Sequence, residues 1–179
     1  GVNLRRPPRH VEELVADGRA TRVRVVADGP VLWAATERVP VLQAVAAGGD
    51  EQLCQDPPVT VPPRLAALSW ERSAALVEIV RGRLQGLGPT RTEPLARSLG
   101  VSETRVDAAM AALEGEGFVL RGLFTPGADG TEWCERRLLA RIHRYTLNRL
   151  RREIAPVTAV EFLRFLAVWQ RVDPEERGQ

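Results

Sequence analysis

The sequence predicts an α+β, mainly helical chain built on a winged helix, that is, a helix-turn-helix followed by a β-hairpin wing. Three observations lead to this fold class. Apolar residues recur at helical spacing in three successive segments after residue 65, glycines end the second and third of these segments, and a hairpin pattern with a Pro-Gly-Ala-Asp-Gly turn follows at residues 126–130. A helix–hairpin segment precedes this unit, and two C-terminal helices follow it.

The winged helix is expected to span residues 65–134, with helices at 69–84, 92–99 and 102–115. Thr92 and Ser102 stand where helix N-caps are favoured, and Gly100 ends the second helix. The inward faces repeat at the spacing that an amphipathic helix requires. The residues expected to be buried on these faces are Leu76, Ile79, Val80, Leu84, Val106, Met110 and Leu113. The strands of the wing are expected at 118–124 and 131–134.

A shorter segment, residues 1–47, precedes the winged helix. Alternation of polar residues with valine predicts a half-exposed strand, and Asp28-Gly29 is typical of a hairpin turn. Two Pro-Pro pairs then mark residues 48–64 as an extended linker. The elements expected in the first segment are a helix at 10–16, strands at 19–26 and 31–37, and a helix at 41–47.

A faint internal repeat links the two segments. Four features of the first segment recur in the winged helix at offsets of 99 to 101 residues. Either the first segment is the back half of a second winged helix, or the match is the chance similarity of any helix followed by a hairpin. The repeated features are Leu14, Gly18, Asp28-Gly29 and Trp33, which correspond to Leu113, Gly117, Asp129-Gly130 and Trp133.

The charge distribution points to an anionic partner. All 25 basic residues are arginine, and the formal net charge of the chain is only +2. Residues 135–172, in contrast, carry nine arginines against three glutamates, a local charge of +6. A basic block on a nearly neutral chain makes nucleic acid the first candidate partner.

The strongest single feature is the helix expected at residues 135–154. Its apolar residues fall on one face, and its arginines cover the opposite half with Tyr145 among them. A guanidinium group can donate two parallel hydrogen bonds to phosphate oxygens, and an aromatic ring between arginines can stack on a base. The alternative is an ordinary amphipathic helix whose arginines are solvated or paired with acids of a neighbouring domain. The candidate DNA-binding residues are Arg137, Arg141, Arg144, Tyr145, Arg149, Arg151 and Arg152.

The winged helix is expected to pack against other domains, or to touch backbone phosphates only. In the helix at 102–115, the outward face offers one arginine, Arg105, among alanines and acids, which is a poor set for contacting base edges in a major groove. Thr158 and Glu161 form a capping box that starts a last helix. That helix is so apolar, from Phe162 to Trp169, that we expect it to be buried against something.

Motifs for catalysis are absent from the sequence. It contains no GxxxxGK[ST] loop and no glycine-rich nucleotide fingerprint. Cys54 and Cys134 are 80 positions apart and only two histidines accompany them, so we expect no metal site and no disulfide framework. We therefore expect no catalytic residue and no cofactor in this segment. No apolar run is long enough to span a membrane and no signal peptide opens the chain, so a cytoplasmic location is expected.

Several short motifs in the second half resemble one protein family. They are Glu132-Trp133-Cys134, the arginine-rich run that follows, Arg149–Ile154, Pro156-Val157 and Phe162–Gln170. Together with the winged-helix pattern, they make residues 65–172 similar to Lhr-type (large helicase-related) proteins.

The resemblance implies a segment of a bacterial, ATP-dependent superfamily II DNA helicase that tracks single strands from 3′ to 5′ and is linked to DNA repair. ATP and Mg²⁺ would belong to the RecA-like motor domains of the same polypeptide. The resemblance also implies an aromatic residue that stacks on a base, for which Trp33 is a candidate beside Tyr145.

We therefore expect this segment to be an accessory domain that binds the sugar-phosphate backbone of single-stranded or tailed duplex DNA, without sequence specificity. Two alternatives remain open at this point. One is a winged-helix transcription regulator that dimerises through the helix at 135–154. The other is a protein-docking module whose arginine face meets an acidic protein surface.

Overall fold

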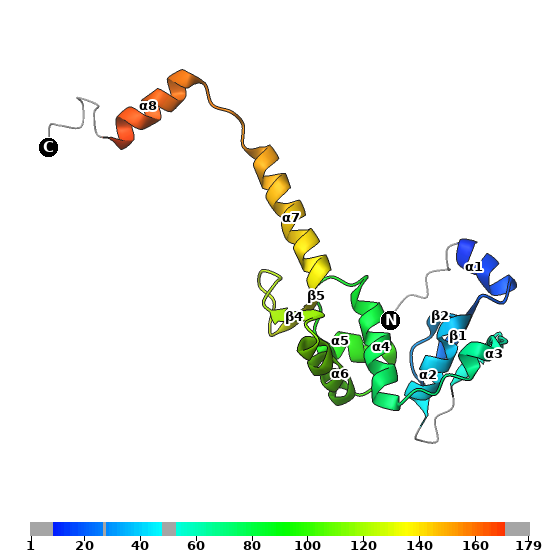
Figure 1. The fold of residues 1–179 in the computed structure, drawn as a ribbon. Coiled ribbons are helices and arrows are strands. Elements are labelled where there is room, and N and C mark those ends of the chain that lie inside the picture. The colour runs from blue at the N-terminus through cyan, green and yellow to red at the C-terminus, as the bar shows by residue number, and fades with distance from the viewer. Residues whose placement is uncertain (1–8, 27, 48–52, 171–179) are drawn as a thin grey trace. The chain divides into compact units, whose positions relative to one another are not determined.

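The computed structural model describes residues 9–26, 28–47 and 53–170 of the 179-residue chain. This part has an α+β fold that is mainly helical, as expected, with one three-stranded and one two-stranded antiparallel sheet (Figure 1). The chain divides into two compact units, Gly1–Leu139 and Ala140–Gln179.

Regular elements follow one another closely in the first unit. The helix–hairpin segment contains α1 (Arg9–Ala16), β1 (Ala20–Arg24), β2 (Leu32–Ala35), the 3₁₀ turn η1 (Thr36–Arg38) and α2 (Val39–Ala46). The remaining elements are β3 (Cys54–Asp56), α3 (Pro63–Ala66), α4 (Arg72–Leu84), α5 (Thr92–Leu99), α6 (Glu103–Gly115), β4 (Val119–Gly122) and β5 (Glu132–Glu135). The helix α7 (Arg136–Glu153) begins in this unit and ends in the second, which also contains α8 (Ala159–Trp169).

One hydrophobic core joins the helix–hairpin segment to the helices that follow it. Val23 of β1 and Leu42 and Val45 of α2 belong to the same buried cluster as Val80 of α4 and Met110 of α6. Each of these five side chains is at most 5% exposed. Because buried apolar side chains from both segments fill one core, the two segments form a single packed body.

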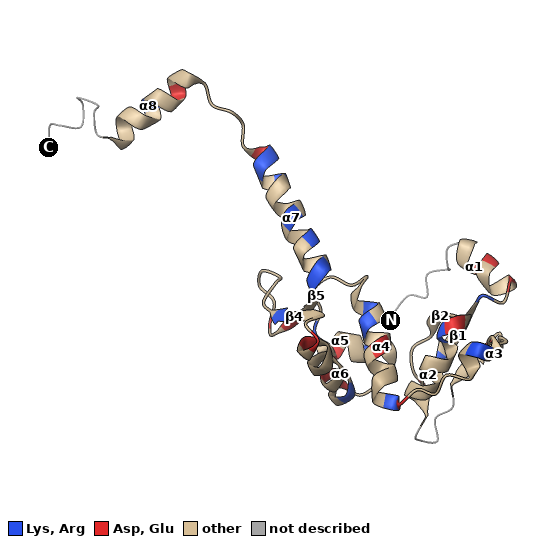
Figure 2. Cartoon of the chain, in the orientation of Figure 1, with Lys and Arg blue, Asp and Glu red and all other residues tan. Residues whose placement is uncertain are grey.

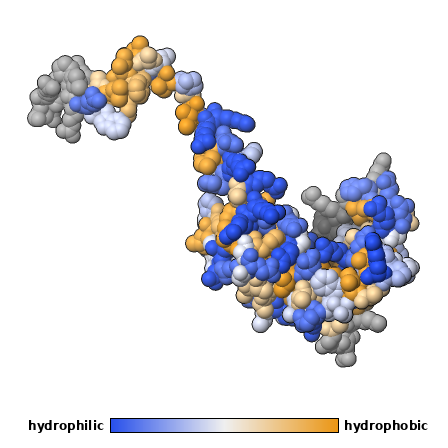
Figure 3. Space-filling model, in the orientation of Figure 1, coloured by the Kyte–Doolittle hydropathy of each residue, from blue (hydrophilic) through white to orange (hydrophobic). Residues whose placement is uncertain are grey.

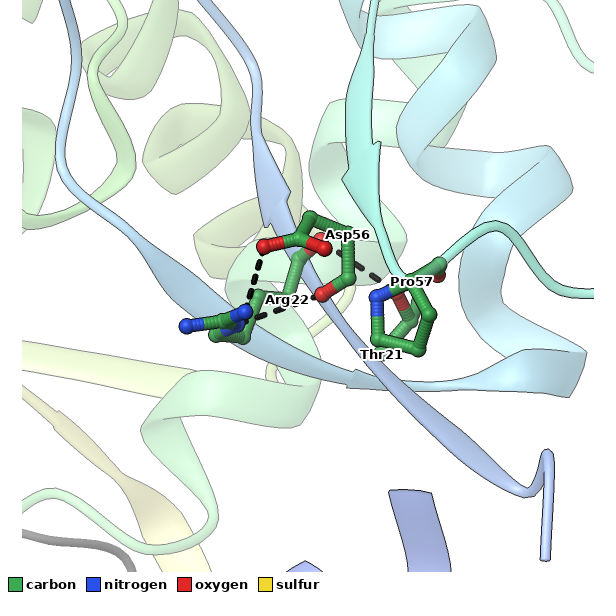
Figure 4. Close-up of polar contacts among 4 residues, drawn as sticks. All are labelled: Thr21, Arg22, Asp56 and Pro57. Atoms are coloured by element: carbon green, nitrogen blue, oxygen red, sulfur yellow. Dashed lines mark hydrogen bonds and ion pairs between the residues drawn. The ribbon is translucent and has the colours of Figure 1, made fainter. Parts of the chain in front are cut away.

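The stretch 48–64, expected to be an extended linker, contains a further strand. β3 pairs antiparallel with β1, with Asp56 opposite Arg22. The Thr21 hydroxyl donates a hydrogen bond of 2.6 Å to the Pro57 carbonyl, and the Arg22 guanidinium pairs with the Asp56 carboxylate (Figure 4). Three residues are too few to show a period-two pattern, so these long-range contacts, and not the local sequence, define the strand. Residues 48–52 lie outside the described part.

The order α4, α5, α6, β4, β5 is consistent with a winged-helix-like fold. Thr90, between α4 and α5, forms an antiparallel bridge with Trp133 through two backbone hydrogen bonds of 2.9 and 2.7 Å, which extends the hairpin sideways. The predicted stripe of α6 is confirmed, since Val106, Met110 and Leu113 are fully buried.

Two details of the helix ends differ from expectation. Thr92 is the first residue of α5, and Arg91 takes the N-cap position. Thr92 is buried, which leaves its side chain in the packed interior of the unit. Ser102 does precede α6 at the N-cap, but its side chain makes no capping hydrogen bond there.

Two glycines of the proposed repeat end their helices in the same way, as Gly100 also does after α5. Gly18 after α1 and Gly117 after α6 adopt left-handed backbone conformations with φ of +68° and +69°, a region that glycine enters without steric cost. The residue after each glycine donates its N–H back to the helix, Arg19 to Leu14 over 2.8 Å and Phe118 to Leu113 over 2.9 Å. Each hairpin therefore leaves its helix through the same backbone connection.

The second unit contains the rest of α7 and α8. The predicted capping box is confirmed, since the Thr158 side chain accepts the N–H of Glu161 and the Glu161 carboxylate accepts the N–H of Thr158. Most side chains of α8 that we expected to be buried are exposed, with Phe165 and Trp169 at 52% and 71% and in edge-to-face contact. Hydrophobic surface lies along α8 (Figure 3). Among the described residues, no helix is long and apolar enough to cross a membrane.

Candidate nucleic-acid interface

The first turn of α7 is fixed to the winged-helix-like body. Glu135 is 6% exposed and accepts hydrogen bonds from the backbone N–H groups of Arg137 and Leu138, so it caps the helix. The N–H of Arg136 donates to the Phe118 carbonyl over 3.0 Å, and Leu138 is buried. The sequence suggested only that Glu135 is one of two acids in this helix; its capping role depends on the preceding strand.

The motif Glu132-Trp133-Cys134 has a structural role. The Glu132 carboxylate accepts the N–H groups of Phe124 and Thr125 at the base of the wing loop, over 2.9 and 2.7 Å. The pKa of Glu132 lies below its ordinary value, mainly because its carboxylate accepts the N–H of Thr125. The Thr125 hydroxyl, the N–H of Phe124 and the charge of Arg91 lower this pKa further.

The next two residues of the motif are part of the interior. Trp133 packs in the core with the Arg121 guanidinium 5.6 Å from its ring centroid. Cys134 is fully buried, and burial raises the pKa of its thiol. An inaccessible thiol with a raised pKa is chemically inert, so Cys134 serves packing.

The arginines of α7 are exposed, and they recur along the helix (Figure 2). Within the described residues, the guanidinium groups of Arg141, Arg144, Arg151 and Arg152 form no ion pair and no hydrogen bond. Arg149 differs from them, because its Nε lies 3.1 Å from the Glu153 carboxylate, one turn along the helix.

Tyr145 projects from the same half of the helix and is 69% exposed. Its ring therefore stands among cations without a covering neighbour. The opposite face of α7 is also uncovered, with Ile142 and Leu150 at 38% and 52% exposed. The arginine face of α7 thus carries one exposed ring, that of Tyr145, so it can bind phosphates and stack on a base.

Trp33 is a separate candidate, because it lies on β2 in the first unit whereas Arg141–Arg152 lie in the second. Its side chain is 42% exposed at a groove of about 610 Å³ between β2 and α4. Arg38 and Arg83 also line this groove, and Arg38 is paired with Glu78 of α4 over 2.8 Å. An indole ring beside cations has the chemistry to stack on a nucleobase.

The arginine of α6 is used inside the molecule. Nη2 of Arg105 donates to the Val45 carbonyl at the end of α2 over 3.0 Å, and Nε of Arg72 donates to the same oxygen over 3.2 Å. This contact joins α6 to α2 within the first unit. It also removes the best base-contacting side chain from the helix on which a sequence-specific regulator would depend.

The first unit contains a further cluster of arginines that the sequence analysis did not predict. Arg81 and Arg136 line a cavity of about 520 Å³ together with Arg137, which was predicted. On the helical wheel Arg136 falls on the apolar side of α7, and Arg81 belongs to a helix far away in the sequence. The run Arg136-Arg137 was the available signal. The described part of the chain holds no cluster of three or more His, Cys, Asp or Glu residues that could bind a metal ion.

Comparison with curated proteins finds a protein named "Lhr helicase/ probable uracil glycosylase" from Mycolicibacterium smegmatis (strain ATCC 700084 / mc(2)155). This chain is 28% identical to it over 144 residues, which are 80% of the chain and 9% of that protein. The chain therefore spans less than a tenth of the length of this relative. No protein-family model and no solved structure matches the chain.

Proposed function

We propose that this chain is an accessory domain of an ATP-dependent DNA helicase, built on a winged helix, that binds the backbone of single-stranded or tailed duplex DNA without sequence specificity. The helicase tracks from 3′ to 5′ in the cytoplasm and serves DNA repair. Its RecA-like motor domains, in the same polypeptide, bind ATP and Mg²⁺. This chain supplies no catalytic residue and positions the strand for the motor.

The observation that carries the proposal is the arginine face of α7. Four of its guanidinium groups have no acidic partner among the described residues, although 23 acidic residues are present in the chain. Arginine forks match phosphate oxygens, and a row of them along a helix contacts successive phosphates without distinguishing bases. Similarity to a protein named as an Lhr helicase supports a helicase as the parent protein.

The same face could instead meet an acidic protein surface. Binding of single-stranded DNA by the isolated chain distinguishes DNA binding from protein docking, because a surface that docks a protein is not expected to bind DNA of random sequence. A transcription regulator is the less favoured alternative, because Arg105 of α6 is committed to the Val45 carbonyl.

The test replaces Arg141, Arg144 and Arg152 by Ala and measures fluorescence anisotropy with labelled random-sequence single strands at several salt concentrations. Each phosphate contact contributes about 0.7 to the slope of log K against log salt on single strands, so we expect three lost contacts to lower that slope by about 2. Circular dichroism should show a folded protein, because all three side chains are exposed.

A matched control removes the same charge elsewhere. Arg19, Arg24 and Arg64 are exposed residues of the first unit, so their triple Ala variant has the same net charge as the α7 variant. We expect it to keep most of the affinity and of the salt slope. Equal losses in both variants would mean that net charge, and not the α7 face, drives binding; an unchanged α7 variant would remove that helix from the strand path.

A further inference from the structure

The cavity beside the ring of Phe118 is a second place where cations gather. It lies where the end of α4, the turn after α6 and the start of α7 meet, and Arg81, Arg136, Arg137 and Gln85 line it. All of these residues belong to the first unit. Its volume of about 520 Å³ is within the range of about 300–1,000 Å³ that is usual for small-ligand sites.

The acids around this cavity are already engaged. The Glu116 carboxylate lies 2.6 Å from Nη2 of Arg81, and Glu78 lies 3.4 Å from its Nε. Arg81 is also held 4.9 Å above the centroid of the Phe118 ring. Glu135 accepts the two backbone N–H groups that start α7. These contacts fix Arg81 in place and use the negative charge that could neutralise the other arginines.

Arg136 and Arg137 are the cations left over. Both are exposed, and neither guanidinium forms an ion pair with a residue in 9–26, 28–47 or 53–170. The guanidinium of Arg136 lies against Gly117, where an added Cβ would be 3.9 Å from Nη1. Because Gly117 has no side chain, nothing at that position comes between the guanidinium and the cavity.

We propose that this cavity binds a phosphate group through the side chains of Arg136 and Arg137, with the Gln85 amide as a further donor. Guanidinium groups donate two parallel hydrogen bonds to phosphate oxygens, and these two belong to adjacent residues on one backbone that Glu135 and Phe118 hold in place. In the helicase, the phosphate belongs to the nucleic-acid backbone. The source of the phosphate rests on the proposed function; the site itself does not.

The site is tested first with inorganic phosphate and the full chain. Amide resonances of Gly117, Phe118, Arg136 and Arg137 should shift saturably in ¹H–¹⁵N spectra, with chloride at equal ionic strength as the reference. The double variant R136Q/R137Q, which keeps polar side chains but removes both charges, should lose these shifts. A control variant, R24Q/R64Q, carries the same charge change on β1 and α3 and should keep them.

The source is tested with labelled single-stranded DNA and the same variants. Loss of one phosphate contact should weaken binding roughly 3- to 10-fold at low salt and lower the salt slope by about 0.7 in R136Q/R137Q only. Absence of the phosphate-induced shifts, or their persistence in R136Q/R137Q, would overturn the site whatever DNA does. Shifts combined with unchanged DNA affinity in the double variant would overturn the nucleic-acid source. Shifts in a chain that binds no DNA would support the site, for free phosphate or a nucleotide, while the proposed function fails.

Discussion

Replacing Leu42 by Ala tests whether the helix–hairpin segment shares one core with α4, α5 and α6. Leu42 is 5% exposed on α2 and belongs to the same buried cluster as Val80 and Met110. Leu→Ala changes in cores cost about 2–5 kcal/mol, from lost transfer free energy and from the cavity left behind. Leu42 also borders the groove beside Trp33, so water can enter part of the vacated space. We therefore expect the lower part of that range, about 2–3 kcal/mol.

The assay is native-state amide hydrogen exchange, with the thermal midpoint as a second readout. If the core is shared, amides of Val23 in β1 and of Met110 in α6 lose the same free energy of protection, and the midpoint falls by roughly 10 °C. The matched control is Leu68→Ala at a residue that is 53% exposed, which should change the free energy of unfolding by less than about 0.5 kcal/mol. Lost protection in β1 with unchanged protection at Met110 would refute a common core.

Two further predictions concern the wing and the α7 face. Glu132→Gln should speed amide exchange at Phe124 and Thr125. Because the native pKa of Glu132 is lowered, the stabilisation by its carboxylate is fully present above the ordinary glutamate pKa and is lost as pH falls through the lowered value. The difference in thermal midpoint between wild type and variant should therefore be large near neutral pH and should disappear in acid. Equal differences at both pH values would contradict this. Tyr145→Ala should weaken single-strand binding by about 1–3 kcal/mol in anisotropy titrations, whereas Tyr145→Phe keeps the ring and should keep the affinity. A Phe variant as weak as the Ala variant would assign the effect to the hydroxyl.

The longer helices were predictable because their signals are local. Gly100 and Gly117 both adopt positive φ at helix ends, and the buried residues of α6 follow the 3.6-residue period from Val106 to Leu113. The capping box of α8 lies within four residues. In each case, residues that are neighbours in the sequence decide the conformation, so no tertiary information is required.

The strand β3 shows where local signals end. Its partner β1 is more than thirty residues away, and the contact that identifies it, Arg22 with Asp56, joins residues 34 apart. The proline pairs around it correctly indicate extended backbone. Extended backbone is equally compatible with a linker and with an edge strand, and only the position of β1 decides between them.

The burial expected for α8 depends in the same way on something outside the local sequence. Its apolar composition is a fact of the sequence, but which surface covers Phe162 and Trp169 is not, and within the described residues both remain half exposed or more. An apolar helix of this kind is covered in the assembled protein or marks an interaction surface. Under the proposed function, we expect another part of the same polypeptide to cover this helix.

One part of the candidate site could be predicted from local sequence, and the other could not. The arginine face of α7 could be predicted, because a helix places residues at 100° intervals and the sign of each residue is known. The cavity beside Phe118 could not, because its cations come from α4 and α7 and its ring from the turn after α6. Only the folded body brings these three segments together.

The motif that carries the resemblance also shows how structure and function are arranged along the chain. Glu132 closes the wing loop, Trp133 and Cys134 fill the core, and Glu135 caps α7, so these four residues set where the helix starts. Arg136 and Arg137 follow at once and are the first side chains free to meet a ligand. These four residues therefore make the helix start at a fixed place on the wing. What α7 binds depends on its own arginines. The variants that remove these charges, and not the resemblance, are therefore the decisive test of function.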